Sequence, residues 1–165
     1  MLLASAAALP ALLATAGCRS SDLFTGPDPL AGPPPLSHGV VTLQAVIAAE
    51  ETLVQLYKRA IADDLAATAR GSPLKPLLAQ HEQHLLQLRA RLILPPGWPT
   101  AKASPTTQPG ARPVRVTIAR LREAERASAA GLVRRLATVE PALAQLFASI
   151  AASDATHVTA LSGAS

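Results

Sequence analysis

Four stretches of this chain have apolar residues at helical spacing, and each carries ionisable residues in the middle of its apolar face. An ionisable group inside a protein costs free energy unless it is paired or binds a metal. One such group per helix predicts four helices packed around a shared polar centre, as in a four-helix bundle. The residues are Glu50 in the first stretch, His81 and His84 in the second, Glu125 in the third, and Asp154 and His157 in the fourth.

The apolar spacing, together with the prolines and glycines, sets the expected bounds of the helices. We expect the first helix over 40–69, ended by the Gly-Ser-Pro sequence at 71–73. The second should run from residue 74 to the Pro-Pro-Gly sequence at 95–97, and the third over 114–138. The fourth should begin at Glu140-Pro141, because proline is favoured in the first turn of a helix.

The connections between these helices differ in length. Short breaks separate the first helix from the second and the third from the fourth, whereas 95–113 is a long segment rich in Pro, Thr and Ser. Two helical hairpins joined by one long crossover form the ferritin-like topology. The sequence therefore predicts an all-α fold, a ferritin-like four-helix bundle over 40–163 with a long crossover between helices 2 and 3.

Composition supports a helical core and excludes several functions. Aromatic residues make up only 2% of the chain, so the core must be built from small and aliphatic side chains, which suits close helix packing. The net charge of +4 comes without a basic run interleaved with aromatic residues, which argues against nucleic-acid binding. No glycine-rich phosphate loop and no Gly-x-Ser-x-Gly sequence is present, so no enzymatic reaction is indicated.

The N-terminal segment predicts export. Residues 2–17 are apolar but too short and too rich in alanine for a membrane span, and they fit the apolar region of a secretory signal. The sequence Thr15-Ala16-Gly17-Cys18 resembles a bacterial lipobox, although Leu, Val or Ile is usual at the position of Thr15. We therefore predict a signal peptide over 1–18 and lipid attachment at Cys18, with an uncleaved anchor or a buried helix as the alternative. Because no basic residue precedes the apolar run, we expect the true start upstream.

Residues 19–39 are expected to form a tether. They are rich in Pro, Gly and Ser, and five prolines within 27–35 preclude a helix there. His38, at the end of this segment, is expected to be an exposed linker histidine. The protein would then be exported and held by its lipid on the outer face of the cytoplasmic membrane or in the cell envelope. The membrane is the partner indicated; a homo-oligomer is compatible with the sequence but not specified by it.

The polar centre has two interpretations. In the first, Glu50, His81, His84, Glu125, Asp154 and His157 bind iron, manganese or zinc, metals that suit mixed histidine and carboxylate ligands. The i, i+3 spacing of the two pairs places both members on one helix face, as in ferritin-like dimetal sites. However, His81 stands where a bridging glutamate is expected, and Asp154 is shorter than Glu. Fewer carboxylates favour a single divalent metal or a weak site over an oxygen-activating centre.

In the second interpretation, the same side chains satisfy one another by hydrogen bonds and no metal is involved. Glu50 would then accept from Tyr57 or from His81, and Asp154 would pair with His84 or with His157. No cofactor is specified by the sequence alone.

Several of these features together resemble a known family. The stretch from Ala48-Ala49-Glu50 to Tyr57, the histidine at position 81, the Pro-rich crossover and the lipobox-like segment resemble an actinobacterial ferritin-like family, a domain of unknown function often found in exported lipoproteins. The resemblance covers about residues 40–162, and Glu50, Tyr57 and His81 fall at family positions. It implies the ferritin-like fold and no particular activity, since a fold does not determine a function.

Overall fold

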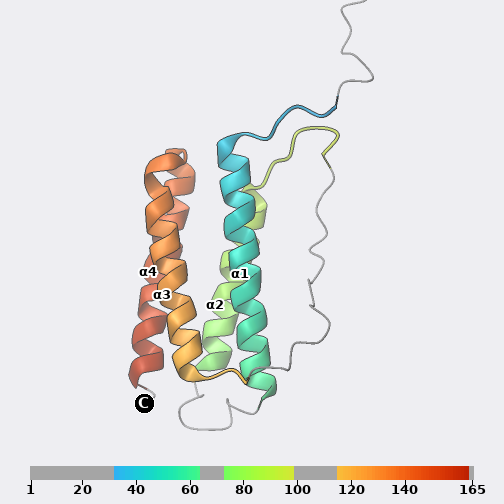
Figure 1. Ribbon diagram of the computed structural model, residues 1–165. Coiled ribbons are helices and arrows are strands. Elements are labelled where there is room, and N and C mark those ends of the chain that lie inside the picture. Colours follow the sequence, from blue (N-terminus) through green and yellow to red (C-terminus); the bar gives the residue numbers. More distant parts are fainter. Residues whose placement is uncertain (1–31, 64–72, 99–114, 164–165) are drawn as a thin grey trace, which may run out of the picture. The chain divides into compact units, whose positions relative to one another are not determined.

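The structure is a computed structural model that describes residues 32–63, 73–98 and 115–163. Within these residues it contains helices and no strand, which confirms the predicted all-α class (Figure 1). The elements are α1 (His38–Ala62), α2 (Leu74–Arg91), α3 (Ile118–Arg135), the short 3₁₀ helix η4 (Leu136–Thr138) and α4 (Pro141–Gly163).

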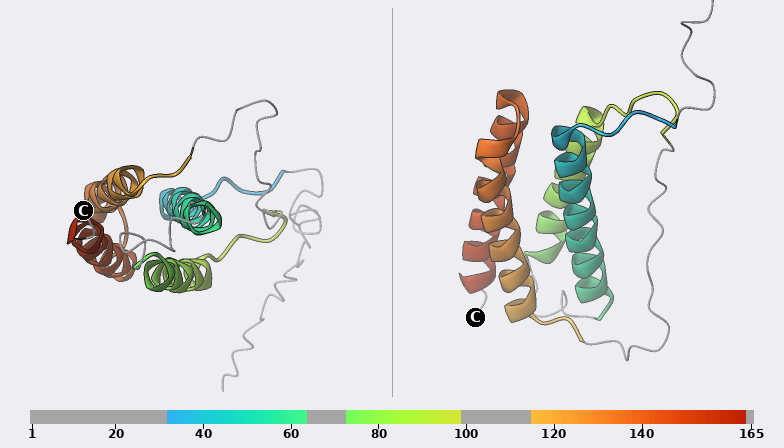
Figure 2. Two further views of the ribbon diagram at one scale, coloured as in Figure 1. Left: turned by 90° about the horizontal axis from the view of Figure 1, so that it is seen from below. Right: turned by 45° about the horizontal axis from the view of Figure 1, so that its top comes forward.

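The four long helices are arranged as two antiparallel pairs. α1 packs along α2, and α3 packs along α4. Less extensive contacts of α1 with α3 and of α2 with α4 join the two pairs. Figures 1 and 2 show that α2 and α3 run in the same direction. The four helices thereby surround a common interior, which is the arrangement that one polar residue per helix predicts.

Capping residues explain where the helices begin. Ser37 accepts a hydrogen bond from the backbone N–H of Val40, so α1 starts at His38, two residues earlier than expected. His38 is exposed as expected, but it belongs to α1 and not to the tether. Thr117 caps α3 in the same way, and α3 therefore starts at Ile118, later than the predicted residue 114. Pro141 is the first residue of α4, as predicted.

Three helix ends also differ from the prediction. α2 ends at Arg91, before the Pro-Pro-Gly sequence at 95–97. Asp63 caps the C-terminal end of α1, and residues 64–69 of the predicted first helix lie outside the described part of the chain. The predicted third helix is interrupted before its end, because its last turn tightens into η4. Such 3₁₀ turns are common at the ends of α-helices.

The interior consists of a polar layer between two apolar clusters. The first cluster is centred on Phe147, with Leu88, Ile150 and other aliphatic residues around it. The second contains Leu74, Leu121 and Leu161, and also the ring of Tyr57. The polar residues Glu50, His81, Glu125, Asp154 and His157 are buried in the same bundle. Their charges therefore lie in a medium of low dielectric constant, where pairing decides their energy.

A turn after α2 ties this end of the helix to the start of α1. The backbone N–H of Trp98 donates to the carbonyl of Pro95, and Gly97 has φ 87°, the conformation that a type II turn requires at its third residue. The indole of Trp98 then donates to the carbonyl of Pro34 at 2.8 Å.

Of the described helices, α1 alone has the length and apolar composition of a membrane span. Of its most apolar stretch, 44% is buried in the bundle. A helix with one face in a protein core has the same properties, so this composition does not indicate a span. The predicted signal peptide over 1–18, Cys18 and most of the tether lie outside the described residues.

Candidate metal centre

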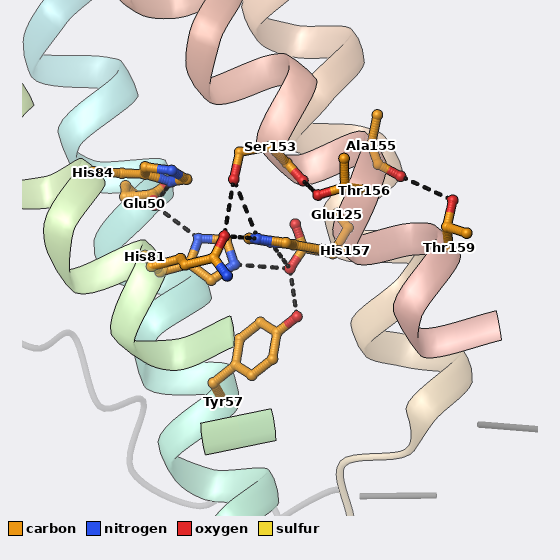
Figure 3. Close-up of polar contacts among 11 residues, drawn as sticks. Glu50, Tyr57, His81, His84, Glu125, Ser153, Ala155, Thr156, His157 and Thr159 are labelled. Carbon is orange, nitrogen blue, oxygen red and sulfur yellow. Dashed lines mark hydrogen bonds and ion pairs between the residues drawn. The ribbon is translucent and has the colours of Figure 1, made fainter. Parts of the chain in front are cut away.

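The six residues predicted from the helical spacing meet at one place inside the bundle, and Figure 3 shows all of them except Asp154. α1 contributes Glu50, α2 contributes His81 and His84, α3 contributes Glu125, and α4 contributes Asp154 and His157. Five of them are buried, and the side chain of His84 is 12% exposed. The prediction of a shared polar centre with a contribution from every long helix is thus confirmed.

His81 lies at the middle of this centre. Its Nδ1 is 2.8 Å from Glu50 Oε1, and its Nε2 is 2.8 Å from Glu125 Oε1. A carboxylate oxygen only accepts hydrogen bonds, so both contacts are satisfied at once only when both ring nitrogens carry a proton. Burial acts to lower the pKa of His81, but the hydrogen bonds and charges of Glu125 and Glu50 outweigh it and raise that pKa to about 10. In the absence of a metal, His81 is therefore an imidazolium between two carboxylates.

The two carboxylates are held ionised by these contacts. Burial acts to raise the pKa of Glu125, but its contacts with His157 and His81 outweigh burial and lower that pKa to about 2. Burial also acts to raise the pKa of Glu50, and the hydrogen bonds of His81 and His84 leave it below its ordinary value. The Tyr57 hydroxyl donates to Glu125 Oε1, and burial together with the charge of Glu125 raises its pKa, so it stays protonated.

Gln80 and Ser153 fix the orientation of His157. The Nε2 of His157 is 3.0 Å from the side-chain oxygen of Gln80, which can only accept, so this nitrogen carries the ring proton. The hydroxyl of Ser153 lies 3.2 Å from the same nitrogen and also donates to Gln80. A neutral His157 with its proton on Nε2 has its lone pair on Nδ1, and this nitrogen lies 3.4 Å from Glu125 Oε1.

Asp154 is the least compensated charge of the centre. Among the described residues neither of its carboxylate oxygens has a hydrogen-bond partner, although its side chain is fully buried. Burial raises the pKa of Asp154 to about 6; the nearby Ser128 hydroxyl, which makes no hydrogen bond to it, opposes this effect, and the charge of Glu125 adds to it. A buried carboxylate without partners is costly, and a cation beside it would remove that cost.

The unpartnered atoms converge on one point. Within the described residues, Glu125 Oε2, both oxygens of Asp154 and Nδ1 of His157 are buried without hydrogen bonds. With His81, these residues offer four ligand atoms that all lie within 4.8 Å of one another. Two imidazole nitrogens and two carboxylate oxygens form a donor set suited to iron, manganese or zinc. We call these four residues, His81, Glu125, Asp154 and His157, the inner group.

A second set of possible ligands adjoins the inner group. Glu50, His81 and His84 also offer three atoms within 4.8 Å of one another, and we call them the outer group. Glu50 Oε1 lies 3.2 Å from Nδ1 of His84, in addition to its contact with His81. His81 thus belongs to both groups, through a different ring nitrogen in each case.

A groove between α1 and α3 extends to this centre. Its volume is about 590 Å³, and its lining includes Glu50 and Ser128 together with apolar residues of both helices. Four arginines also line it: Arg59, Arg120, Arg134 and Arg135. Of the outer group, Glu50 lines the groove.

The pairings expected from the sequence are only partly correct. The Glu50–His81 contact is confirmed, but Tyr57 reaches Glu125 instead of Glu50, because its hydroxyl extends across the interior to α3. The expected pairing of Asp154 with His84 or His157 is wrong, since neither oxygen of Asp154 has a partner in the described part of the chain. Sequence reasoning also missed Gln80 and Ser153; their only signal was position, Gln80 next to His81 and Ser153 one turn before His157.

Comparisons with protein-family models, with curated proteins and with solved structures find no match for this chain.

The charges of the centre predict how the stability of the metal-free protein depends on pH. His81 holds in the folded state a proton that the unfolded chain loses near pH 6.5, so its contribution is complete below that pH and is lost as the pH rises to about 10. Asp154 likewise keeps its proton up to about pH 6, so stability falls as the pH rises from about 4 to 6. Glu125 acts oppositely, and its contribution is lost only as the pH falls toward 2. Thermal melts followed by circular dichroism in the presence of chelator should therefore show higher stability near pH 5 than at pH 9.

The variant Asp154→Asn tests the origin of this dependence. It should remove the decrease between about pH 4 and 6 and raise the unfolding free energy at pH 8 by about 1–3 kcal/mol. Glu51→Gln, a change at the neighbouring surface carboxylate, is the matched control and should leave the profile unchanged. Equal stability at pH 5 and pH 9 would contradict the paired state of His81.

Proposed function

We propose that this protein binds a divalent transition-metal cation at the inner group and that the cation stabilises the helical bundle. The observation that carries the proposal is the convergence of unpartnered buried lone pairs on Glu125, Asp154 and His157. A core whose polar residues satisfied one another would leave few such atoms, because buried polar groups are nearly always hydrogen-bonded. The self-satisfied core explains Glu50, His81 and Tyr57, but not Asp154.

The contacts around the inner group support a metal site with two supporting hydrogen bonds. The ligands would be Nε2 of His81, Nδ1 of His157 and the carboxylates of Glu125 and Asp154. Glu50 would accept the remaining proton of His81, and Gln80 accepts that of His157. Ligating histidines usually donate their second N–H to a carboxylate or carbonyl in this way, which fixes the ring and its tautomer.

Charge favours a divalent ion. The two carboxylates of the inner group carry two negative charges, which a divalent cation neutralises, and neutrality matters in a buried site. Iron(II), manganese(II) and zinc(II) all accept imidazole and carboxylate ligands. Four protein ligands complete a tetrahedral site, which is typical of structural metal sites, so we propose cation binding rather than catalysis.

The arrangement of helices supports a ferritin-like topology. α2 and α3 run in the same direction, so the segment that joins them has to connect opposite ends of the bundle. We propose that this connection is the long crossover predicted from the sequence. A crystal structure in which α2 and α3 are antiparallel neighbours would contradict it.

We also propose that the bundle is an exported lipoprotein attached to the membrane through Cys18. The support is the apolar run before Thr15-Ala16-Gly17-Cys18 and the Pro-rich segment after it. The metal site and the anchor are independent, and either could fail without the other.

Titration of the chelator-treated full-length chain with Zn²⁺ or Mn²⁺, followed by calorimetry, tests the metal site. We expect one high-affinity equivalent, accompanied by proton release because His81 must lose a proton to bind through Nε2. At free metal 100 times Kd, the unfolding free energy should rise by about 2.7 kcal/mol.

Three variants make this experiment specific. Asp154→Asn should lower the affinity at least tenfold, and Gln80→Ala should lower it by about 10–100-fold, as expected for a residue that orients a ligand. Glu51→Gln should bind like the wild type. The absence of stoichiometric binding of zinc, manganese and iron(II) would refute the proposal and favour the self-satisfied core.

Mass spectrometry of the protein from the membrane fraction of a bacterial expression host tests the anchor. We expect the mature chain to begin at an acylated Cys18, and Cys18→Ala to abolish the acylation. A mature N-terminus at any other residue, or an unmodified Cys18, would contradict lipid attachment.

A further inference from the structure

The position of His81 has a consequence beyond a single metal site. Its two ring nitrogens face different ligand groups: Nε2 faces Glu125 of the inner group and Nδ1 faces Glu50 of the outer group. A carboxylate that bridges two cations does so through two oxygens on one carbon, whereas an imidazole presents two nitrogens on opposite sides of a ring. His81 is therefore placed to contact a cation on each side (Figure 3).

Occupation of the inner group changes the environment of Glu50. In the metal-free centre Nδ1 of the His81 ring lies 2.8 Å from the buried carboxylate of Glu50. A cation at Nε2 leaves that ring neutral, and the two charges of the cation are already balanced by Glu125 and Asp154. Glu50, which is 2% exposed, then carries a negative charge that no group of the inner site balances.

We infer that a second divalent cation binds at the outer group, between Glu50 and His84, and that His81 bridges the two cations through Nδ1 and Nε2. This inference rests on the proposed inner site. The three ligands of the second cation are Glu50, Nδ1 of His81 and a ring nitrogen of His84.

The proton and charge balance is complete. The imidazolium of His81 loses the proton on Nε2 to the solvent when the first cation binds, and the proton on Nδ1 when the second cation binds. The ring is then an imidazolate with one negative charge. Together with the carboxylates of Glu50, Glu125 and Asp154, it supplies four negative charges, which balance two divalent cations.

The two sites differ in their access to solvent. The inner group has four buried ligands, whereas the outer group has three ligands, a partly exposed His84 and the adjoining groove between α1 and α3. A site with three protein ligands keeps a position for water or a small ligand. The second cation should therefore bind more weakly and exchange faster than the first.

Equilibrium dialysis of the full-length chain against Zn²⁺ at pH 8 tests the number of sites. We expect two equivalents in the wild type, one tight and one weaker, and a single tight equivalent in His84→Ala. Gln83→Ala, a change at an exposed neighbour on α2, is the matched control and should retain two. Circular dichroism of each variant checks that the fold is kept.

Electron paramagnetic resonance of the Cu²⁺-loaded protein tests the bridge. Two Cu²⁺ ions joined by an imidazolate couple antiferromagnetically, so the signal should rise with the first equivalent and fall with the second. In His84→Ala, the signal of one equivalent should persist.

Two outcomes overturn the inference while the proposed inner site survives. One is a single Zn²⁺ equivalent in the wild type that His84→Ala does not alter. The other is two equivalents of Cu²⁺ with additive, uncoupled signals. If the wild type binds no metal at all, the proposed function fails and the second site fails with it.

Discussion

The contact of His81 with two carboxylates is the interaction on which the interior of the bundle depends. The imidazole comes from α2, and its partners Glu50 and Glu125 come from α1 and α3, so one side chain links the two helical pairs. Apolar clusters adjoin this layer, and Glu50, His81 and Glu125 are buried, so a charge left without its partner would be poorly solvated. Removal of one partner from a buried ion pair is strongly destabilising, because it leaves an uncompensated charge. Helix packing and the chemistry of the centre are therefore coupled.

The main features of the fold could be predicted from the sequence because they depend on periodicity. The 3.6-residue repeat assigns each position to a face, and this placed Glu50, His81, Glu125, Asp154 and His157 in the interior correctly. Prolines and glycines marked the breaks between helices. The predicted start of α4 at Pro141 agrees with the structure. Proline suits the first turn of a helix because its φ angle is already helical and because an N–H at this position would have no partner within the helix.

What the sequence could not predict is which side chains meet across the interior. The rotation of each helix and the reach of each side chain decide that Tyr57 contacts Glu125 and that Asp154 has no hydrogen-bond partner among the described residues. Gln80 and Ser153 were missed for the same reason, since they lie beside the apolar faces and become significant only through His157. The starts of α1 and α3 also depended on capping hydrogen bonds of Ser37 and Thr117, which periodicity does not specify.

Anomalous diffraction from crystals of the zinc-loaded protein tests the central claim most directly. The account predicts a strong peak at the zinc absorption edge within bonding distance of Nε2 of His81, Nδ1 of His157 and the carboxylates of Glu125 and Asp154, with Gln80 still bonded to His157. A map without a peak at this point, in which His81 remains paired with both Glu50 and Glu125 and water contacts Asp154, would contradict the claim.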